Sequence, residues 1–326
     1  MTKRIFTWRN GLGGSRLGFN QCRMANKIII AGGTGALGRL LCDAYAMQGW
    51  DVVVLGRSRA PASRNGELIH WDGRTLGDWV VSLEGAAAVV NLAGRSINTR
   101  FTAKHRREIL DSRVMSTAVI GEAIGRCQSP PRVWINAGGI SVFAPSAVMR
   151  TEEDTPDGTG FLAQVSRLWE AAFAGATTPA TRKTLLRISP VLLAHGGTLA
   201  PLVRLTKLGL GGAIGGGNQY MSWIYQDDFV KLVQWLVAKE DIAGTIHACS
   251  PRPVTNAAFM RTLRKTVGVP FGIPAPAWAV RLGAPLIGIE PRLALDGYRI
   301  TSHVLEKAGF RFGFPELATA LRNLML

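Results

Sequence analysis

Three glycines stand at a spacing that suits phosphate binding. Gly32, Gly35 and Gly38 form the pattern G-x-x-G-x-x-G after the apolar run 27–31 and before a helical pattern that continues to about Gln48. The first glycine permits a tight turn, the second lets the backbone approach a pyrophosphate, and the third lets the helix pack on the sheet. The helix start offers N–H groups and the positive end of its dipole, so we predict a dinucleotide site. The predicted binding residues are Gly32, Thr34, Gly35, Ala36, Leu37 and Gly38.

The residues after the second apolar strand, 51–55, indicate which dinucleotide binds. An NAD site often has a carboxylate here for the ribose 2′-hydroxyl, but this chain has Arg57 and Arg59. An arginine can bind a 2′-phosphate in bidentate fashion, and each charge-assisted bond contributes about 1.5–3 kcal/mol. We therefore predict NADP(H), with NAD as the alternative; the other interpretation is that both arginines are solvated surface charges. Asp72, which ends the third strand, either reaches the adenine or caps a turn before Gly73.

The chemistry at such a site needs a proton donor, and none is evident. The stretch TGFLAQVSRLWE at 159–170 predicts a helix with one apolar face, yet it contains no tyrosine, lysine or histidine. Two other hydroxyls are candidates: Ser141 near the end of the fifth strand, and Tyr225 just before a helix. Their structural alternatives are a turn cap for Ser141 and packing for Tyr225. Met221 and Trp223 are predicted to line the substrate pocket, with core packing as the alternative.

The elements that position these residues alternate between strands and helices. Further apolar strands are predicted at 67–71, 86–92, 132–137 and 184–188, with helices at 101–127 and 160–175. Continuous apolar strands between helices indicate a parallel sheet covered on both faces. We predict an α/β fold, a Rossmann-type doubly wound parallel sheet with a small, mostly helical C-terminal domain.

The rhythm of the pattern changes after about residue 195. The glycine-dense segment 209–223 predicts a loop and a short strand, followed by a helix at 226–239 and a strand at 245–248. We expect three parts: a disordered basic extension over 1–23, an NAD(P)-binding domain over 24–250 and a substrate-side helical domain over 251–326. The extension also weakly resembles a transit peptide, and Met24 is a second candidate start.

Composition narrows the function classes. Of the net charge of +16, five positive charges lie in the acid-free residues 1–23, and the remaining +11 fits an anionic ligand. No basic run is interleaved with aromatics, no apolar run reaches 18 residues, and the four cysteines are scattered without a Cys/His cluster. We expect a cytoplasmic protein with no metal, nucleic-acid or membrane partner. The predicted partner is a small-molecule substrate, and a homodimer is left open.

Taken together, the motifs resemble one family. The chain is similar to the extended short-chain dehydrogenase/reductase superfamily, and more narrowly to its atypical NAD(P)-dependent epimerase-like family with a small C-terminal domain of its own. The resemblance implies a Rossmann core and a dinucleotide cofactor, with Leu92, Ala93 and Gly94 over the cofactor and Ser189 near the nicotinamide. The motifs that carry it include GGTGALG, NLAGRSI, SRVMST, INAGGISVFA, TEED, FLAQVSRLWE, LLRISPVLL, GLGGAIGGGNQYMSWIYQDD, PRPVTNAAF and AGFRFGFPELATAL.

The chain departs from that family where catalysis is expected. Short-chain reductases place Tyr-x-x-x-Lys on the helix after the fifth strand, and these positions here are Leu162 and Ser166. The relatives' S-A-x-G-Y-Y-G run reads GGISVFA at 138–144, and the histidine of their WIHxDD motif is Tyr225. Loss of a general acid costs about 10²–10⁴ in rate. Glu170 on the same helix is either buried with a perturbed charge or paired with Arg187, and the pairing is the favoured alternative.

Two functions follow from these observations. The first is an NADP(H)-dependent oxidoreductase or epimerase-like enzyme for a small carbonyl or sugar-like substrate, held between the C-terminal edge of the sheet and the 209–225 loop. Its proton would come from Tyr225, Ser141 or water. The alternative is a non-catalytic dinucleotide-binding regulator or scaffold, favoured by the missing Tyr-x-x-x-Lys pair.

Overall fold

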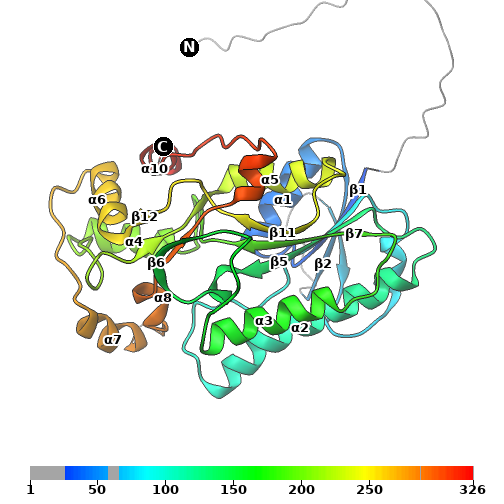
Figure 1. The fold of residues 1–326 in the computed structure, drawn as a ribbon, viewed down its shortest axis with the longest axis horizontal. Coiled ribbons are helices and arrows are strands. Elements are labelled where there is room, and N and C mark those ends of the chain that lie inside the picture. The colour runs from blue at the N-terminus through cyan, green and yellow to red at the C-terminus, as the bar shows by residue number, and fades with distance from the viewer. Residues whose placement is uncertain (1–25, 58–65, 287, 326) are drawn as a thin grey trace, which may run out of the picture.

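A parallel sheet of seven strands forms the body of the protein (Figure 1). The computed structural model describes residues 26–57, 66–286 and 288–325, so the predicted extension over 1–23 and Arg59 lie outside the described residues. The strand order is β3-β2-β1-β4-β5-β7-β11. The strands are β1 (Lys27–Ala31), β2 (Asp51–Gly56), β3 (Glu67–His70), β4 (Ala88–Asn91), β5 (Val133–Gly139), β7 (Arg182–Ile188) and β11 (Gly244–Ala248).

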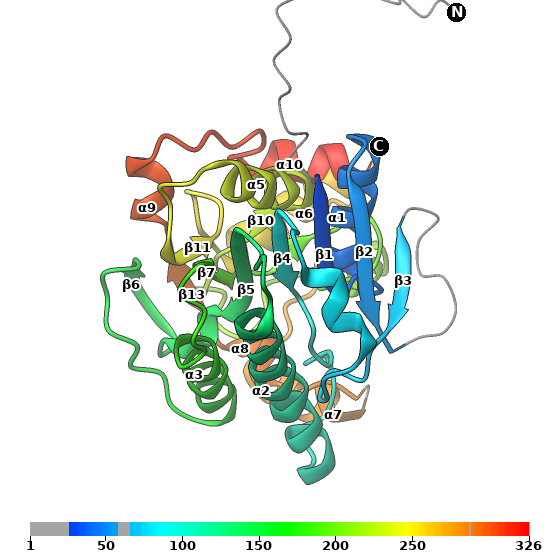
Figure 2. The ribbon, with the colours of Figure 1, turned by 90° about the vertical axis from the view of Figure 1, so that its right-hand side faces the viewer.

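Helices cover both faces of this sheet, which confirms the predicted doubly wound α/β fold (Figure 2). α1 (Ala36–Met47) and α5 (Gln226–Ala238) lie on one face, and α2 (Ala103–Arg126), α3 (Phe161–Ala174) and the 3₁₀ helix η1 (Asp78–Leu83) lie on the other. The central strands are fully buried because alternate side chains enter two different cores. Ile28 and Ile30 face the α1/α5 core, and Ile29 faces the α2/α3 core.

A second, smaller sheet joins the C-terminal region to the body. Its order is β12-β9-β13-β6, and two of its strands come from before residue 250 and two from after it. Neither β6 nor α4 (Leu199–Lys207) was predicted from the sequence. The remaining strands are β6 (Ser146–Arg150), β8 (Val191–Leu192), β9 (Tyr220–Met221), β10 (Ile224–Tyr225), β12 (Val254–Thr255) and β13 (Tyr298–Ile300).

The C-terminal region itself is mainly helical. Its core is built from α4, α6 and α10 around Phe259, Leu263 and Leu321, all fully buried. The short 3₁₀ helix η2 (Ile140–Val142) links β5 to β6. The C-terminal helices are α6 (Asn256–Val267), α7 (Ala277–Leu286), α8 (Arg292–Leu295), α9 (His303–Lys307) and α10 (Leu317–Met325).

Candidate functional site

The glycine turn, residues 32–38, closes tightly against the loop that follows β4. Gly32 has a φ of +77°, and a Cβ there would lie 2.9 Å from the backbone nitrogen of Ala93. A Cβ on Gly38 would lie 2.5 Å from the carbonyl oxygen of Gly32 and 2.5 Å from the Cα of Gly33. Both positions therefore require glycine, because a side chain would collide with the backbone of residues 92–93 at Gly32 and with the backbone of residues 32–33 at Gly38.

The outer side of the same turn is open. A Cβ on Gly35 would contact only the carbonyl oxygen of Gly32, at 3.3 Å, and both Gly35 and Ala36 are exposed. α1 begins directly after Gly35 with no side-chain cap and no acidic residue in its first turn. The first N–H groups of a helix have no partner within the helix, so this end offers donors and positive potential to an anion. Thr34 and Leu37 are half-buried on either side.

The end of β2 lies beside the glycine turn. A Cβ on Gly56 would lie 2.9 Å from Cγ2 of Thr34, and Arg57, the next residue, is exposed. Arg39, on the first turn of α1, donates from Nε to the carbonyl oxygen of Thr34 at 3.0 Å. The sequence prediction named Arg57 but missed Arg39, although Arg39 directly follows the third glycine. The two guanidinium groups place positive charge on the side where a 2′-phosphate would be recognised.

Asp72 has the role of a turn aspartate in the structure. Its Oδ1 accepts from the backbone N–H groups of Arg74 at 2.8 Å and Thr75 at 2.9 Å, and its Oδ2 accepts from the Thr75 hydroxyl at 2.7 Å. These bonds hold the pKa of Asp72 below its usual value, the bond from the Thr75 backbone being the main cause. The carboxylate is occupied by its own turn, so the structure does not favour the adenine contact predicted for Asp72.

A buried amide network fixes the loop after β4. Asn91 donates from Nδ2 to Oδ1 of Asn136 at 2.7 Å, and its Oδ1 accepts from the backbone N–H of Ala93 at 3.0 Å. Trp169 on α3 donates to the hydroxyl of Thr117 at 2.8 Å, which in turn bonds Asn136. The network holds Ala93 against the glycine turn, so the predicted residues Leu92, Ala93 and Gly94 lie at the same edge of the sheet as residues 32–38.

Arg113 on α2 brings an unneutralised charge to this loop, and the sequence prediction missed it. A Cβ on Gly94 would lie 3.1 Å from Cζ of Arg113, and that Cζ lies 5.2 Å from the centre of the Trp169 ring. Nη1 donates to the carbonyl oxygens of Arg95 and Ile109, each at 3.0 Å. Among the described residues no carboxylate forms an ion pair with Arg113. Burial lowers the pKa of Arg113 to about 10, which still leaves it charged at neutral pH.

Ser189, directly after β7, has a buried hydroxyl with no hydrogen-bond partner among the described residues. A buried hydroxyl without a partner is costly, unless a ligand supplies one. The uncapped start of α1 and this hydroxyl lie at the carboxyl ends of β1 and β7, where open α/β sheets bind ligands. Both features fit a nicotinamide dinucleotide.

The positions of the missing Tyr-x-x-x-Lys pair are apolar or buried. Leu162 is half-buried, and Ser166 is 5% exposed. The Ser166 hydroxyl faces the end of β5, because a Cβ on Gly139 would lie 3.1 Å from it. The first turns of α3 therefore place neither a tyrosine nor a lysine next to the end of β5.

Tyr225 and Trp223 are core residues rather than pocket residues. Tyr225 is 1% exposed, donates its hydroxyl to Asn323 on α10 and packs 4.1 Å from the ring of Phe314. Burial, with Asp227 and Asp228, raises the pKa of Tyr225 to about 12. Trp223 is also 1% exposed, and its indole N–H donates to the carbonyl oxygen of Arg252 at 3.3 Å. The predictions of Tyr225 as proton donor and Trp223 as pocket wall are not favoured by this geometry, because helix α10 covers this part of the chain.

Ser141 and Met221 lie closer to the end of the sheet. Ser141 is half-buried on η2, two residues after β5. Tyr298 packs against the apolar cluster that contains Ile140 and Val142, the two neighbours of Ser141, and Ser141 lowers the pKa of Tyr298. Met221 is half-buried on β9, and its backbone pairs with that of Tyr298 in the small sheet. The sequence prediction missed Tyr298, which the fold brings beside both predicted residues.

A second polar cluster occupies the β7/β11 edge of the same sheet. We call it the Arg187 cluster: Glu152, Glu170, Arg187 and His247. Arg187 binds both carboxylate oxygens of Glu170, at 2.9 and 2.8 Å, which confirms the predicted pair. His247 contacts Arg187 at 3.5 Å and the carbonyl oxygen of Thr301 at 3.0 Å, and its backbone N–H donates to Glu152.

Glu152 extends the Arg187 cluster to the C-terminal region. Its carboxylate accepts from the hydroxyl of Ser302 and, at 3.0 Å, from the backbone N–H of His303. Burial lowers the pKa of His247 below its usual value, so the ring is neutral near pH 7. The polar groups of the Arg187 cluster satisfy one another, which indicates a structural role.

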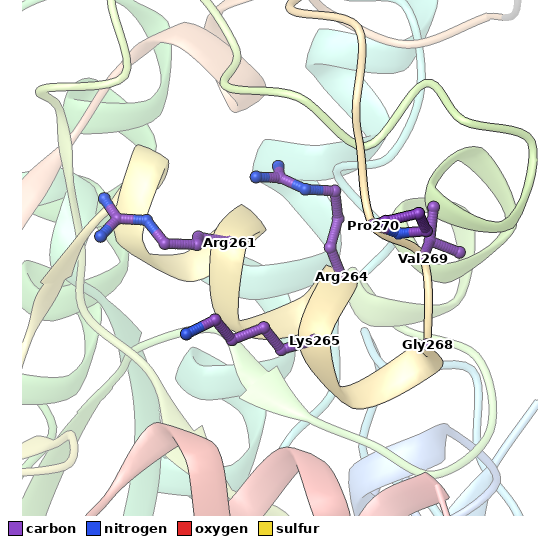
Figure 3. A pocket seen from close by; sticks show the side chains of 6 residues that line it. All are labelled: Arg261, Arg264, Lys265, Gly268, Val269 and Pro270. Atoms are coloured by element: carbon purple, nitrogen blue, oxygen red, sulfur yellow. The ribbon is translucent and has the colours of Figure 1, made fainter.

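A basic hollow of about 240 Å³ lies on α6 (Figure 3). It is lined by Arg261, Arg264 and Lys265 and by the turn 268–270. Arg264 donates to the carbonyl oxygen of Gly211 at 2.7 Å, while Arg261 and Lys265 are exposed. No residue of the glycine turn lines this hollow.

The structure describes residues 26–57, 66–286 and 288–325. Within these ranges no group of three or more His, Cys, Asp or Glu side chains is arranged to hold a metal ion. Within the same ranges no helix has the length and apolar character needed to cross a membrane.

Comparison with known proteins finds a family model and relatives that match most of the chain. Residues 28–248 match the NAD dependent epimerase/dehydratase family, and residues 275–324 match a domain of unknown function, DUF1731. The epimerase family protein SDR39U1 of Bos taurus is 30% identical over 305 residues, which cover 92% of this chain and 99% of that protein.

Solved structures agree with this match. The human epimerase family protein SDR39U1 (isoform 2), solved with NADPH, superposes with a TM-score of 0.81 at 27% identity over 91% of this chain and 98% of its own. A nucleoside-diphosphate sugar epimerase from Corynebacterium glutamicum gives a TM-score of 0.71 at 28% identity over 90% of this chain and 57% of its own.

Proposed function

The chain belongs to the NAD dependent epimerase/dehydratase family, and from that premise we propose that it is an NADP(H)-dependent oxidoreductase or epimerase for a small carbonyl or sugar-like substrate. One observation carries the proposal: α1 starts without a side-chain cap behind an exposed Gly35, while the Gly32 and Gly38 positions are closed to any side chain. This combination presents backbone donors to a diphosphate. The NADPH bound to the human relative supports the choice of cofactor.

Each part of the cofactor has residues suited to it. The backbone around Gly35 and Ala36 would hold the diphosphate, and Arg57 with Arg39 would bind the 2′-phosphate. Ser189 would gain a partner for its orphaned hydroxyl. When bound, NADPH supplies a hydride for a carbonyl carbon.

The substrate is proposed to lie beyond the loop 92–94, between the ends of β4 and β5 and the small sheet. Arg113 offers a charged donor to a substrate oxygen or anion there. Ser141 and Met221 are the predicted residues that remain close to this place. We propose a small molecule as the partner and no nucleic acid, so duplex DNA should not retain the protein at physiological salt.

The proposal is tested with the purified full-length protein. We expect it to bind NADP(H) more tightly than NAD(H) and to oxidise NADPH, followed by its absorbance, with at least one member of a panel of aldehydes, ketones and nucleotide sugars. A nucleotide sugar should also be tested for epimerisation by chromatography. Binding of neither dinucleotide, or equal affinity for both, would overturn the corresponding part of the proposal.

A second function is favoured by one specific observation. Leu162 and Ser166 occupy the positions of the Tyr and Lys that move the proton in short-chain reductases, which suits a dinucleotide-binding regulator without turnover. Such a regulator would bind NADPH tightly and change its unfolding temperature, but no substrate in the panel would be reduced or epimerised. Turnover of any panel member at a rate above the cofactor-only background excludes it.

A further inference from the structure

Tyr298 and Ser141 come together from distant parts of the chain. Ser141 follows β5 on η2, and Tyr298 opens β13, whose neighbours in the small sheet are β6 and β9. Tyr298 packs against the cluster that contains Ile140 and Val142, the two neighbours of Ser141, and Ser141 lowers the pKa of Tyr298. Both residues are half-buried rather than fully buried in the core. Tyr225, by contrast, is 1% exposed under α10. Tyr298 is therefore a partly exposed tyrosine beside the end of β5.

A cation lies beside this pair, at the start of α3. Arg292 on α8 brings Nη1 to within 3.2 Å of the place of a Cβ on Gly160, the residue that precedes α3. Figures 1 and 2 both place α8 next to that end of α3. Arg292 also binds Asp296 at 3.1 Å, and its charge acts on the Tyr298 hydroxyl. Leu162, where a tyrosine is missing, is only two residues beyond Gly160.

We propose that Tyr298 is the proton donor of this protein, positioned by Ser141 and Arg292, and that these three residues take the place of the missing Tyr-x-x-x-Lys pair. The inference rests on the proposed reductase function and names the residue that it lacks. A tyrosine, a serine and a cation at the end of the fifth strand supply the same groups as the short-chain reductase set, but from the C-terminal region instead of α3.

The proton balance of the step is simple. The carbonyl carbon gains the hydride that NADPH supplies, and the carbonyl oxygen takes the proton from Oη of Tyr298, so a C–H and an O–H bond form as the Oη–H bond breaks. The carbonyl is reduced to an alcohol and NADPH is oxidised to NADP⁺. The phenolate that remains accepts a hydrogen bond from Ser141 and is stabilised by the charge of Arg292, and water returns its proton.

The environment of Tyr298 favours the role of acid over that of base. Burial is the largest effect and raises the pKa of Tyr298 above its usual value, and Asp296 raises it further. Ser141 and the charge of Arg292 act in the opposite direction. The phenol is thus protonated at neutral pH, as a donor to a carbonyl oxygen must be, while two neighbours moderate the cost of losing the proton.

The first test needs no turnover. The chain has four tyrosines, so biosynthetic 3-fluorotyrosine gives four ¹⁹F signals, which Tyr→Phe variants assign. The midpoint pH of the Tyr298 signal is measured free, with NADP⁺ and with NADPH. We expect NADP⁺, whose nicotinamide ring is positive, to lower that midpoint by about 1 or more relative to NADPH. Arg292→Gln and Ser141→Ala should each raise it. A midpoint that is the same with either cofactor form overturns the proposal.

The second test uses the substrate found in the carbonyl panel. Tyr298→Phe is expected to lower kcat about 10²–10⁴-fold with unchanged NADPH affinity. Tyr45→Phe is the matched control. Tyr45 lies on the core-facing side of α1, and its hydroxyl is buried with no hydrogen-bond partner among the described residues, so kcat should stay at the wild-type value. Arg292→Lys should retain more activity than Arg292→Gln. A Tyr298→Phe variant with wild-type kcat overturns the proposal.

The two tests separate this inference from the function on which it rests. If NADP⁺ shifts the Tyr298 midpoint but no carbonyl is turned over, the proposed function fails and the placement of Tyr298 beside the nicotinamide holds. If turnover occurs and is indifferent to Tyr298→Phe, the function holds and the inference fails.

Discussion

Two regions at the carboxyl ends of the same parallel sheet differ in how their polar groups are paired. At the β1/β2/β4 edge, the glycine turn leaves the start of α1 uncapped and exposed, with Arg57 and Arg39 beside it. At the β7/β11 edge, the Arg187 cluster pairs its charges with one another and ties residues 302–303 to the sheet. The first region has a helix start without a side-chain cap, whereas the charged groups of the Arg187 cluster are paired with one another.

This difference distinguishes a binding site from a cluster that connects two parts of the structure. An uncapped helix start beside a glycine turn offers backbone donors to an anion, and the buried Ser189 hydroxyl has no partner among the described residues. The Arg187 cluster is just as polar, yet Arg187 and Glu170 hold each other in bidentate fashion. Polarity at the end of a strand is therefore not enough to identify a site; the decisive property is whether the hydrogen bonds are already satisfied.

The largest expected effect is on stability, and it belongs to the Arg187 cluster. Glu170→Gln leaves the guanidinium of Arg187, whose side chain is 7% exposed, without its counter-charge. We expect the free energy of unfolding to fall by about 3 kcal/mol or more, measured by urea denaturation, with NADPH affinity unchanged. The control is Glu122→Gln, which removes an exposed pair with Arg126 and should cost less than about 1 kcal/mol. A loss of NADPH binding in folded Glu170→Gln would contradict the division between the two regions.

The second prediction concerns the glycine turn. Gly38→Ala places a Cβ 2.5 Å from two backbone atoms of residues 32–33, so α1 must move away from the turn. We expect a cost of about 1–3 kcal/mol in stability together with at least about tenfold weaker NADPH binding. Gly283→Ala on α7 is the control, since nothing lies within 4 Å of its Cβ. Unchanged NADPH affinity in Gly38→Ala would mean that this turn does not hold the cofactor.

The third prediction concerns the preference for NADP(H) over NAD(H) at the β1/β2/β4 edge. Arg57→Ala should weaken NADP(H) binding about tenfold, because one charge-assisted contact with the 2′-phosphate is lost, and leave NAD(H) binding as it was. Fluorescence titrations with both reduced cofactors measure the ratio. Arg126→Ala, at the far end of α2, serves as the control. Equal weakening of NADPH and NADH would assign Arg57 to general electrostatics instead of 2′-phosphate recognition.

The smallest effect is the pH response of the Arg187 cluster. Burial lowers the pKa of His247 below that of an unfolded chain, so between the two values the unfolded state binds more protons than the folded one. Stability attributable to His247 is thus present near pH 7 and falls as the pH drops below about 6.5. His247→Gln should flatten the dependence of the unfolding temperature on pH between 7 and 5. A variant with the wild-type slope would show that His247 does not titrate in this range.

The sequence predicted best what depends on neighbouring residues. The apolar run 27–31, the three glycines and the helical pattern after them specified β1 and α1, because a strand, turn and helix are each encoded locally. The pair of Glu170 on α3 and Arg187 on β7 was also predicted. Both residues lie on segments that pack in the interior, where an unpaired charge is costly. The alternation of apolar strands with helices was enough to predict the parallel sheet.

The sequence prediction failed where distant segments meet. β6 is a half-exposed strand whose partner β13 lies far along the chain, so its own residues give little signal. Tyr225 and Trp223 were predicted near the substrate because they follow the glycine-rich loop, but α10 and Phe314 bury Tyr225. Tyr298 was overlooked for the same reason: only the small sheet brings it beside Ser141.

The central claim is that backbone donors at the glycine turn bind a nicotinamide dinucleotide. Isothermal titration calorimetry of the purified full-length chain with NADPH tests it most directly. The account predicts one saturable site per chain, with tighter binding of NADPH than of NADH. The absence of any saturable binding of either dinucleotide by folded protein would contradict it.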